Sequence, residues 1–358
     1  MSYNRIRTPR AYVDKISRDF SNGWISESEF TTVRHDGNAF LLEHGHILDL
    51  FDLKPHRYVK IPKETKTFYI QFDTKYSSEL LGESNFVAIL GHNMHSANVN
   101  FAVQTSDSST FGSNVQTVSD ADYTGFSAIV NCQADDADNS YISPQLNGYS
   151  LFTWTDSGDS SNDNRYIRFW FQEDPSATAD FDDDLYIGSL MYGEYLDFPA
   201  NADVGYSVAY DYDESKIQRA IGGSEYSTIT HYGSPMWPYT TSNMTYTSTT
   251  NIGSTSANPY YFMKRAGRKK ISMNFSNVAD TNIFPEHETS SSSYLDSDIF
   301  HSALYQQLAG SHLPFLFGYD NTSTHSSDYG LYRLANSLNA KQVAANTFNF
   351  KMDLEETW

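Results

Sequence analysis

The sequence is poor in cysteine and in positive charge. Cys132 is the only cysteine among 358 residues, so the chain cannot form an internal disulfide. Its neighbours Ala128 to Asn131 have the pattern of a core strand, and we expect a buried rather than a reactive thiol. Lys and Arg number 24 against 44 Asp and Glu, which gives a formal net charge of -20. This balance argues against nucleic acid, and against an anionic membrane, as the main partner.

Long apolar runs are also missing. No segment approaches the ~18 consecutive apolar residues that a membrane-spanning helix needs. Residues Met1 to Arg5 lack the apolar core of a secretion signal. We therefore expect no membrane insertion and synthesis in a cytoplasm.

Several catalytic motifs are absent. No Gly-rich turn ends in Gly-Lys-Ser or Gly-Lys-Thr, which excludes nucleotide hydrolysis by a phosphate loop, and no serine has the sequence of a nucleophile elbow. His92 and His95 follow a turn glycine and lack the helical spacing of a zinc hydrolase, so we interpret His92 as a turn histidine bonded to the backbone. We expect no catalytic residue, no cofactor and no enzymatic activity.

Acidic loops raise the question of calcium. Asp180, Asp182 and Asp184 carry hard oxygen donors on a loop and are weak candidate calcium ligands. No run matches the helix-loop-helix calcium pattern. The alternative, which we favour, is that these carboxylates are a solvated acidic surface with no metal.

Aromatic residues are abundant, at 15% of the chain, and polar residues crowd the gaps between short apolar runs. Strands separated by polar turns explain both facts better than helices do, so we predict a mainly β protein. The strand patterns lie at residues 68–72, 86–90, 99–103, 166–171, 185–190, 271–275, 313–317 and 348–355. One helix is predicted, capped by Ser297 or Asp298 and ending at Gly310.

The chain length favours two domains. We place a lead-in segment and a first β-sandwich at residues 26–190, and a second β-rich domain at residues 191–358. Residues 1–25 stand apart because they are basic in an acidic molecule.

We predict that these first residues form an extended arm. Its charged side chains are Arg5, Arg7, Arg10, Lys15 and Arg18. The arm is either a solvated tail or a subunit contact, in which opposite charge guides docking on an acidic neighbour. The second reading predicts that deletion of residues 1–18 leaves a folded monomer that no longer enters particles.

Aromatic side chains in polar loops suggest a possible sugar contact. Trp154, Trp237 and Tyr239 could stack on sugar rings, since flat apolar faces beside hydrogen-bonding groups suit carbohydrates. The alternative is that these rings pack on their own domain or on a neighbour.

Two stretches carry a resemblance. Phe86 to Asp107, with its turn Leu90-Gly91-His92-Asn93, resembles a pattern in virion proteins of tailed bacteriophages, particularly marine ones, where it belongs to a galactose-binding-like, or discoidin-like, jelly roll. The match continues through 165–169 and 185–193, and residues 1–24 also resemble the start of such proteins. The part from Arg268 to Glu356 resembles the β domain with which phage tail and tail-tip proteins build rings.

The resemblance implies two β-sandwich or jelly-roll-like domains and a structural, non-enzymatic role. It implies a subunit of the virion, made in the host cytoplasm and placed in the tail or baseplate as a tail tip or adaptor ring. Its partners would be identical subunits in a ring or fibre base, and other virion proteins. The alternatives are a carbohydrate-binding module that adsorbs to a host surface glycan, or a capsid decoration or fibre protein.

Overall fold

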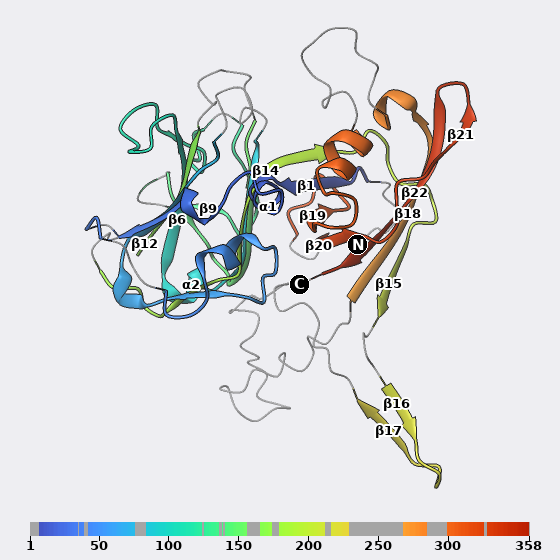
Figure 1. Cartoon of the computed structure of the whole chain (residues 1–358), viewed down its shortest axis with the longest axis horizontal. Helices are drawn as coiled ribbons and strands as arrows, with labels where there is room; N and C mark the ends of the chain where they lie inside the picture. Colours follow the sequence, from blue (N-terminus) through green and yellow to red (C-terminus); the bar gives the residue numbers. More distant parts are fainter. Residues whose placement is uncertain are drawn as a thin grey trace.

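The computed structural model describes residues 7–34, 36–38, 42–75, 84–123, 125–135, 138, 140–155, 165–173, 179–211, 216–228, 268–284, 299–325 and 328–357. As the sequence predicts, the described part is mainly β, with antiparallel sheets and few helices (Figure 1).

One large sheet runs through the molecule and contains eleven strands among the described residues. Its order is β15 (Ser207–Asp211), β18 (Arg268–Ala279), β22 (Thr347–Glu356), β20 (Tyr329–Leu334), β19 (Phe315–Gly318), β1 (Arg10–Asp14), β14 (Ser189–Asp197), β5 (Phe86–His92), β11 (Gly148–Thr153) and β8 (Ser127–Val130), with β21 (Ala340–Ala344) paired to β22.

A seven-stranded sheet packs against one half of the large sheet. Its order is β2 (Phe30–Arg34), β4 (Phe68–Asp73), β12 (Tyr166–Glu173), β6 (Val99–Ser106), β10 (Ile142–Ser143) and β9 (Gln133–Ala134), with β7 (Gln116–Thr117) paired to β6. Two strand pairs complete the described sheets: β3 (Val59–Ile61) with β13 (Leu185–Ile187), and β16 (Lys216–Arg219) with β17 (Glu225–Thr228).

The helices are short. They are α1 (Lys15–Ser21), α2 (Met94–Ala97), the 3-10 turns η1 (Glu27–Glu29), η2 (Ile47–Phe51), η3 (Lys63–Thr65) and η5 (Asp280–Asn282), and the π-helix η6 (Ile299–Gln306). The π-helix lies in the segment predicted to be helical, and its Phe300 and Leu304 are buried as expected. The proposed caps at 297 and 298 lie outside the described residues.

The side-chain pattern of each strand reflects which of its faces are covered. In β12 every second side chain is buried, because one face meets the core between the two sheets. In β5 the run is apolar throughout, because both faces are buried: Val87 and Ile89 enter the core between the sheets, whereas Phe86 and Leu90 enter a cluster on the opposite face.

Two cores share one face of the large sheet. The first lies between the two sheets, and the second lies between η6 and the strands β18, β22, β20 and β19. Strand β14 serves both, since Tyr192 belongs to the first core and Leu196 to the second. The predicted boundary at residue 190 therefore falls inside a strand, and the two cores are joined by one continuous sheet.

The predicted N-terminal arm is wrong for residues 10–21. Strand β1 lies in the middle of the large sheet, where Ala11 pairs with Leu196 of β14 and with Phe317 of β19. Asp14 then caps α1 by accepting a hydrogen bond from Ser17 N at 2.7 Å. The high density of charge suggested an extended arm, but Ala11, Tyr12 and Val13 are three consecutive apolar residues. Ala11 and Val13 pack in the second core, and Tyr12 packs in the cluster on the opposite face of the sheet.

Candidate functional site

The exposed large apolar side chains of this protein are concentrated in one short part of the chain. Of twelve such side chains in the described residues, seven lie in the ranges 204–211 and 216–228, which we call the exposed segment. They are Val204, Tyr206, Val208, Tyr210, Ile217, Ile221 and Tyr226. Single exposed apolar residues are ordinary, but a local concentration marks an interaction surface.

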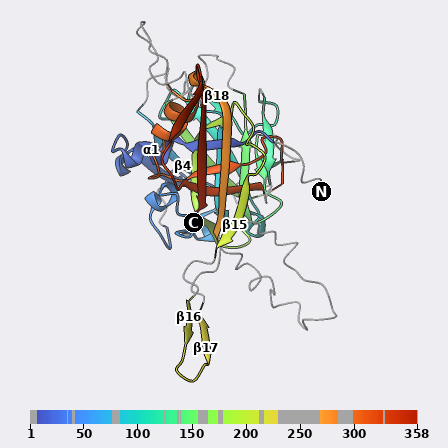
Figure 2. The same ribbon diagram turned by 90° about the vertical axis from the view of Figure 1, so that its right-hand side faces the viewer.

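The first half of the exposed segment is an edge strand. Within the described residues β15 pairs on one side only, with β18, so its other side presents unpaired backbone groups (Figure 2). Val208 and Tyr210 share one side of this strand by alternation, Tyr206 directly precedes the strand, and Val208 lies opposite Ile271 of the second core. The apolar face of the sheet therefore continues beyond the core into solvent. All five residues of β15 are exposed.

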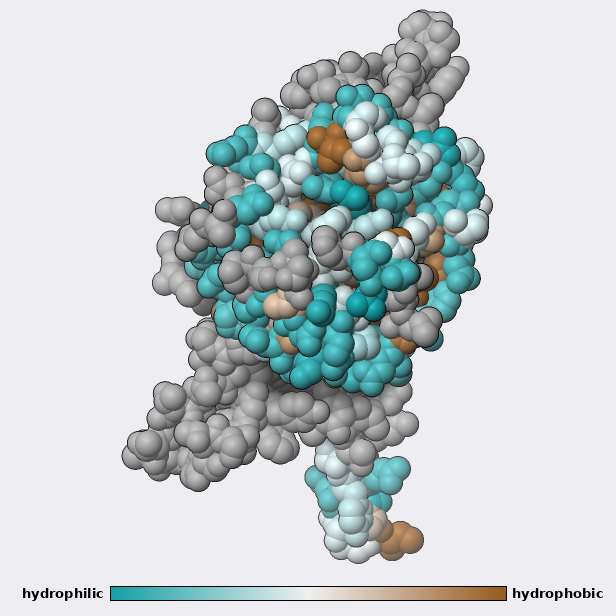
Figure 3. All heavy atoms as spheres, turned by 90° about the vertical axis from the view of Figure 1, so that its left-hand side faces the viewer, coloured by the Kyte–Doolittle hydropathy of each residue, from teal (hydrophilic) through white to brown (hydrophobic). Residues whose placement is uncertain are grey.

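The second half is the hairpin β16–β17, which projects from the body of the molecule (Figures 1 and 2). Its strands pair with each other and, in the part of the chain that is described, with no other strand. Ile221, in its turn, is fully exposed, and Figure 3 shows hydrophobic atoms at the tip of the hairpin. An isolated two-stranded hairpin is marginally stable in water, so this one gains by packing on a partner.

The basic residues proposed for a subunit contact are instead bound within the chain. Arg10 forms a bidentate ion pair with Asp197, with its Nε 2.7 Å from Oδ1, and Arg7 lies 2.8 Å from Asp320. Arg18 pairs with Asp19, and Lys15 is buried in α1. Arg5 lies outside the described residues. Arg7, Arg10 and also Arg18, whose Nη1 donates to Gln307 Oε1, thus hold the N-terminal segment on its own fold.

Of the rings proposed for sugar stacking, Trp154 is also bound within its own chain. Trp154 is only 3% exposed and packs in the first core against Phe152 and Tyr192, so neither of its faces meets solvent. That proposal is wrong for Trp154, because a ring followed by a polar loop can still end a buried strand. Trp237 and Tyr239 lie outside the described residues.

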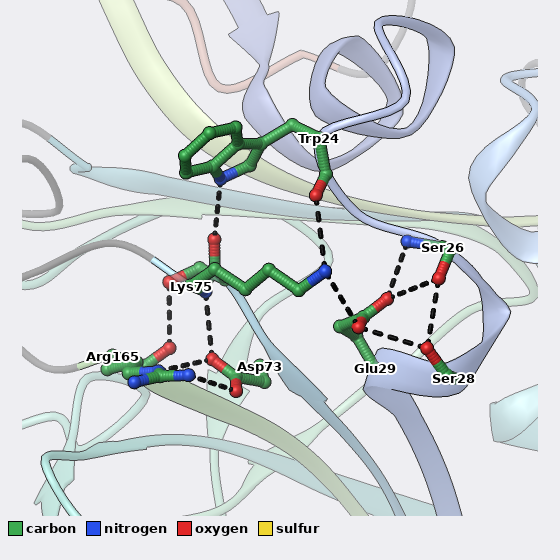
Figure 4. A network of polar contacts seen from close by, with 8 residues as sticks. Trp24, Ser26, Ser28, Glu29, Asp73, Lys75 and Arg165 are labelled. Carbon is green, nitrogen blue, oxygen red and sulfur yellow. Dashed lines mark hydrogen bonds and ion pairs between the residues drawn. The ribbon is translucent and has the colours of Figure 1, made fainter.

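A different tryptophan is exposed at one end of the sandwich. Trp24 is 50% exposed, and its Nε1 donates to the backbone oxygen of Thr74 at 3.1 Å. Lys75 Nζ lies 2.8 Å from Glu29 Oε1 and holds the pKa of Glu29 at about 2. Figure 4 shows this network, made by Trp24, Ser26, Ser28, Glu29, Asp73, Lys75 and Arg165. These contacts join the segment after α1 to the end of β4.

One buried pair has the residue types of a catalytic dyad but not its chemistry. His92 Nδ1 accepts from Met94 N, as the expected turn histidine does, so the neutral ring carries its proton on Nε2. Nε2 therefore donates to Ser150 Oγ at 3.0 Å, and Ser150 Oγ donates to the backbone oxygen of Asn131. Burial lowers the pKa of His92 to about 3. In this tautomer the imidazole cannot take a proton from Ser150.

Cys132 is buried as predicted, and burial raises the pKa of its thiol.

The candidate calcium ligands do not converge. Asp184 is engaged by Lys60, whose Nζ lies 2.8 Å from Oδ2, and by the backbone N of Lys63. Asp180 lies 3.7 Å from Lys66. Among the described residues no group of three or more His, Cys, Asp or Glu side chains is placed to hold a metal ion.

No helix in the described part is long and apolar enough to cross a membrane.

Sequence comparison gives no match to any protein-family model or to any curated protein. Solved structures give partial similarities. A chitosan-binding module of a chitosanase/glucanase from Paenibacillus sp. IK-5 is 12% identical, with a TM-score of 0.27, over 46% of this chain and 92% of that chain. A Ruminococcus gnavus fucosidase in complex with fucose is 11% identical, with a TM-score of 0.27, over 48% of this chain and 26% of that chain.

Proposed function

We propose that this protein is a non-enzymatic structural subunit that assembles with copies of itself through the exposed segment. The observation that carries the proposal is the concentration of exposed apolar side chains on an edge strand and on the hairpin that follows it. The proposed function is self-assembly, because the exposed segment provides apolar contact area and unpaired backbone groups.

The edge strand supports pairing with another chain. Natural edge strands are commonly protected by lysine, proline or a bulge, yet the sequence of β15 is Ser-Val-Ala-Tyr-Asp and its pairing with β18 is regular. Such an edge accepts a further strand through backbone hydrogen bonds, with alternate side chains giving specificity. Asp211 at its end is held by Lys270 at 3.0 Å, so the strand is fixed before it meets a partner.

The projecting hairpin supports a head-to-tail contact. A projection from one side of a subunit that packs against a different surface of the next copy makes a heterologous interface. Such interfaces form rings when the rotation between successive copies closes, and open filaments when it does not. This is the geometry expected of a tail or baseplate subunit. We therefore extend the proposal to the virion of a tailed phage, where the ring would be a tail tip or adaptor.

The test is the oligomeric state of the full chain, measured by light scattering on a sizing column. We expect a defined ring-sized oligomer for the natural sequence, and a shift toward monomer for Ile217→Asp and for Ile221→Asp. Val343→Asp is the matched control, since Val343 is an exposed valine outside the exposed segment. It should assemble normally.

A natural chain that stays monomeric at micromolar concentration would overturn self-assembly, and equal assembly of all three variants would remove the exposed segment from the interface. The virion location has its own test. A labelled antibody against this chain should decorate one site on the tail of phage particles, and decoration of the capsid shell would favour the decoration alternative instead.

A further inference from the structure

Strand β15 has one apolar and one polar face. Val208 and Tyr210 lie on the face that continues the second core, because Val208 pairs with Ile271, a member of that core. Val208 is 39% exposed and Tyr210 is 59% exposed. The other residues of the strand lie on the opposite face; they are Ser207, Ala209 and Asp211. A partner strand that matches this edge therefore needs an apolar and a polar face of its own.

A second copy of β15 meets this requirement in one two-fold arrangement. A two-fold axis perpendicular to the sheet sets the two strands antiparallel and keeps both apolar faces on the same side. A two-fold axis along the strands makes them parallel and turns the second copy over, so that the apolar face of one copy continues into the polar face of the other. Burial of one continuous apolar face favours the antiparallel pair.

The register centred on Ala209 pairs all five residues of the strand. Val208 of each copy then lies opposite Tyr210 of the other, and pairs of a β-branched and an aromatic side chain stabilise antiparallel strands. Ser207 of each copy lies opposite Asp211 of the other, so a hydroxyl can donate to a carboxylate. A register centred on Asp211 instead places two carboxylates opposite each other, which is destabilising. The strand is thus complementary to itself in the first register.

We infer that β15 binds β15 of a second copy of this chain in the antiparallel register centred on Ala209, which joins the large sheets of two molecules into one. Within the described residues β15 pairs with β18 alone, at the margin of the sheet (Figure 2). All five of its residues are exposed. The pair covers an edge on each copy that is otherwise a site for aggregation.

This strand pair is a second contact beside the hairpin contact. A pair of five-residue strands is small, since specific interfaces bury about 1,200 to 2,000 Å². Copies that the hairpin β16–β17 holds in one ring offer several β15 strands at once, so two rings bind each other through several pairs. The expected particle is a double ring with an even number of copies.

The inference rests on the proposed self-assembly, because it names the partner strand for one half of the exposed segment. It does not rest on the virion location, since the two faces of a double ring are equal whereas a phage tail has a direction. The two contacts use different parts of the chain, so variants of Ala209 and of Ile221 separate them.

Cysteine cross-linking of the full chain tests the register. Ala209 lies opposite its own counterpart, with Cα atoms about 4.5 to 5.5 Å apart, which a disulfide spans. Ser207→Cys is the matched control, because it lies on the same face but about 14 Å from its counterpart, four residues along the strand. With copper phenanthroline as oxidant, Ala209→Cys should form a disulfide-linked dimer and Ser207→Cys alone should not. A mixture of Ser207→Cys and Asp211→Cys should cross-link. The natural chain, whose Cys132 is buried, gives the background.

Charge complementation tests the same contact without a covalent bond. Ala209→Asp and Ala209→Lys each place like charges opposite each other, so each alone should give half the mass of the natural particle by light scattering. In an equal mixture Asp lies opposite Lys, and the full mass should return. Both variants should melt within a few degrees of the natural chain, because Ala209 is exposed.

The outcomes distinguish this inference from the proposed function. If the natural chain forms an oligomer but Ala209→Cys does not cross-link, or Ser207→Cys cross-links equally well, the β15 pair is overturned while self-assembly through the hairpin stands. An unchanged mass of Ala209→Asp overturns the pair as well. A natural chain that is monomeric at micromolar concentration overturns both.

Discussion

Gly193 of strand β14 pairs with Asp14 of strand β1. A Cβ added at this position would lie 2.0 Å from the backbone oxygen of Val13 and 3.0 Å from the backbone N of Lys15. Neither neighbour is the end of a flexible side chain, so the strands would have to separate. The contact joins the N-terminal strand to the middle of the large sheet.

We therefore predict that Gly193→Ala lowers the free energy of unfolding by about 3 kcal/mol, the upper range for overpacking a rigid site. Urea titration followed by circular dichroism measures it. Gly222→Ala is the control, since its Cβ would meet nothing within 4 Å. Equal stability of the two variants would contradict this view of the β1–β14 contact.

His92 gives a second prediction at this scale, in the pH dependence of stability. Its pKa is about 3 in the folded protein and 6.5 in an unfolded chain, so the unfolded chain binds the proton first as the pH falls. The contribution of His92 is complete above pH 6.5 and is lost between about pH 6.5 and 3, with a slope of at most about 1.4 kcal/mol per pH unit. In His92→Asn the free energy of unfolding should fall less steeply over this range. An unchanged slope would assign the acid sensitivity to other groups.

Individual residues were predictable where local sequence decides. Cys132 and His92 behave as expected, because a thiol in an apolar strand and a histidine after a turn glycine have few alternatives. The burial of Trp154 was not predictable, because its ring packs against Phe152 and Tyr192, and only the fold brings Tyr192 beside it. The burial of Asn100 Nδ2 and Trp170 Nε1 without a hydrogen-bond partner could not be predicted either, because it depends on the pairing of β6 with β12 and on what covers these strands.

At the scale of elements, strand β1 joins the two cores. Its pairing partners β14 and β19 lie about 180 and 300 residues away in the chain, so its position is set by sheet assembly alone. Asp14 strengthens the junction: its Oδ1 accepts from Tyr192 N at 2.8 Å, and its Oδ2 caps α1. Burial raises the pKa of Asp14 to about 6.

Deletion of residues 1–18 removes this strand and most of α1. We expect the truncated chain to lose cooperative unfolding, in contrast to the folded monomer that an extended arm would leave behind. The physical reason is that two sheet edges, on β14 and on β19, would be exposed together with the apolar residues that β1 covers. Differential scanning calorimetry is the measurement. A sharp transition near that of the full chain would show that β14 and β19 hold without β1.

The strands themselves were predictable, since the strand patterns at 68–72, 166–171 and 348–355 correspond to strands β4, β12 and β22. Their partners were not. Strands β5 and β6 follow each other in sequence yet lie in different sheets, because pairing is decided by which apolar faces bury together. A period-two pattern predicts which face of a strand is buried, but it does not predict which strand pairs with it.

At the scale of the whole molecule, the continuous sheet makes the two predicted domains interdependent. Residues 26–190 contain most of the first core but lack β1, most of β14 and three members of that core, Ile16, Ile25 and Tyr192. We predict that this fragment expressed alone shows no near-ultraviolet circular dichroism signal, whereas residues 7–358 do. A fragment with a native-like signal would establish the sandwich as an independent domain.

The central place of β1 has a consequence for how the molecule is made. The strand leaves the ribosome before its partners, and β19 follows about 300 residues later, which at roughly 5 to 20 residues per second is a delay of about 15 to 60 s. During that interval the nascent chain carries a strand that can pair on one side only, with β14, and the large sheet cannot close until β19 has emerged. High-level expression should therefore favour inclusion bodies, and a chaperone that holds residues 10–21 until β19 has emerged should raise the soluble yield.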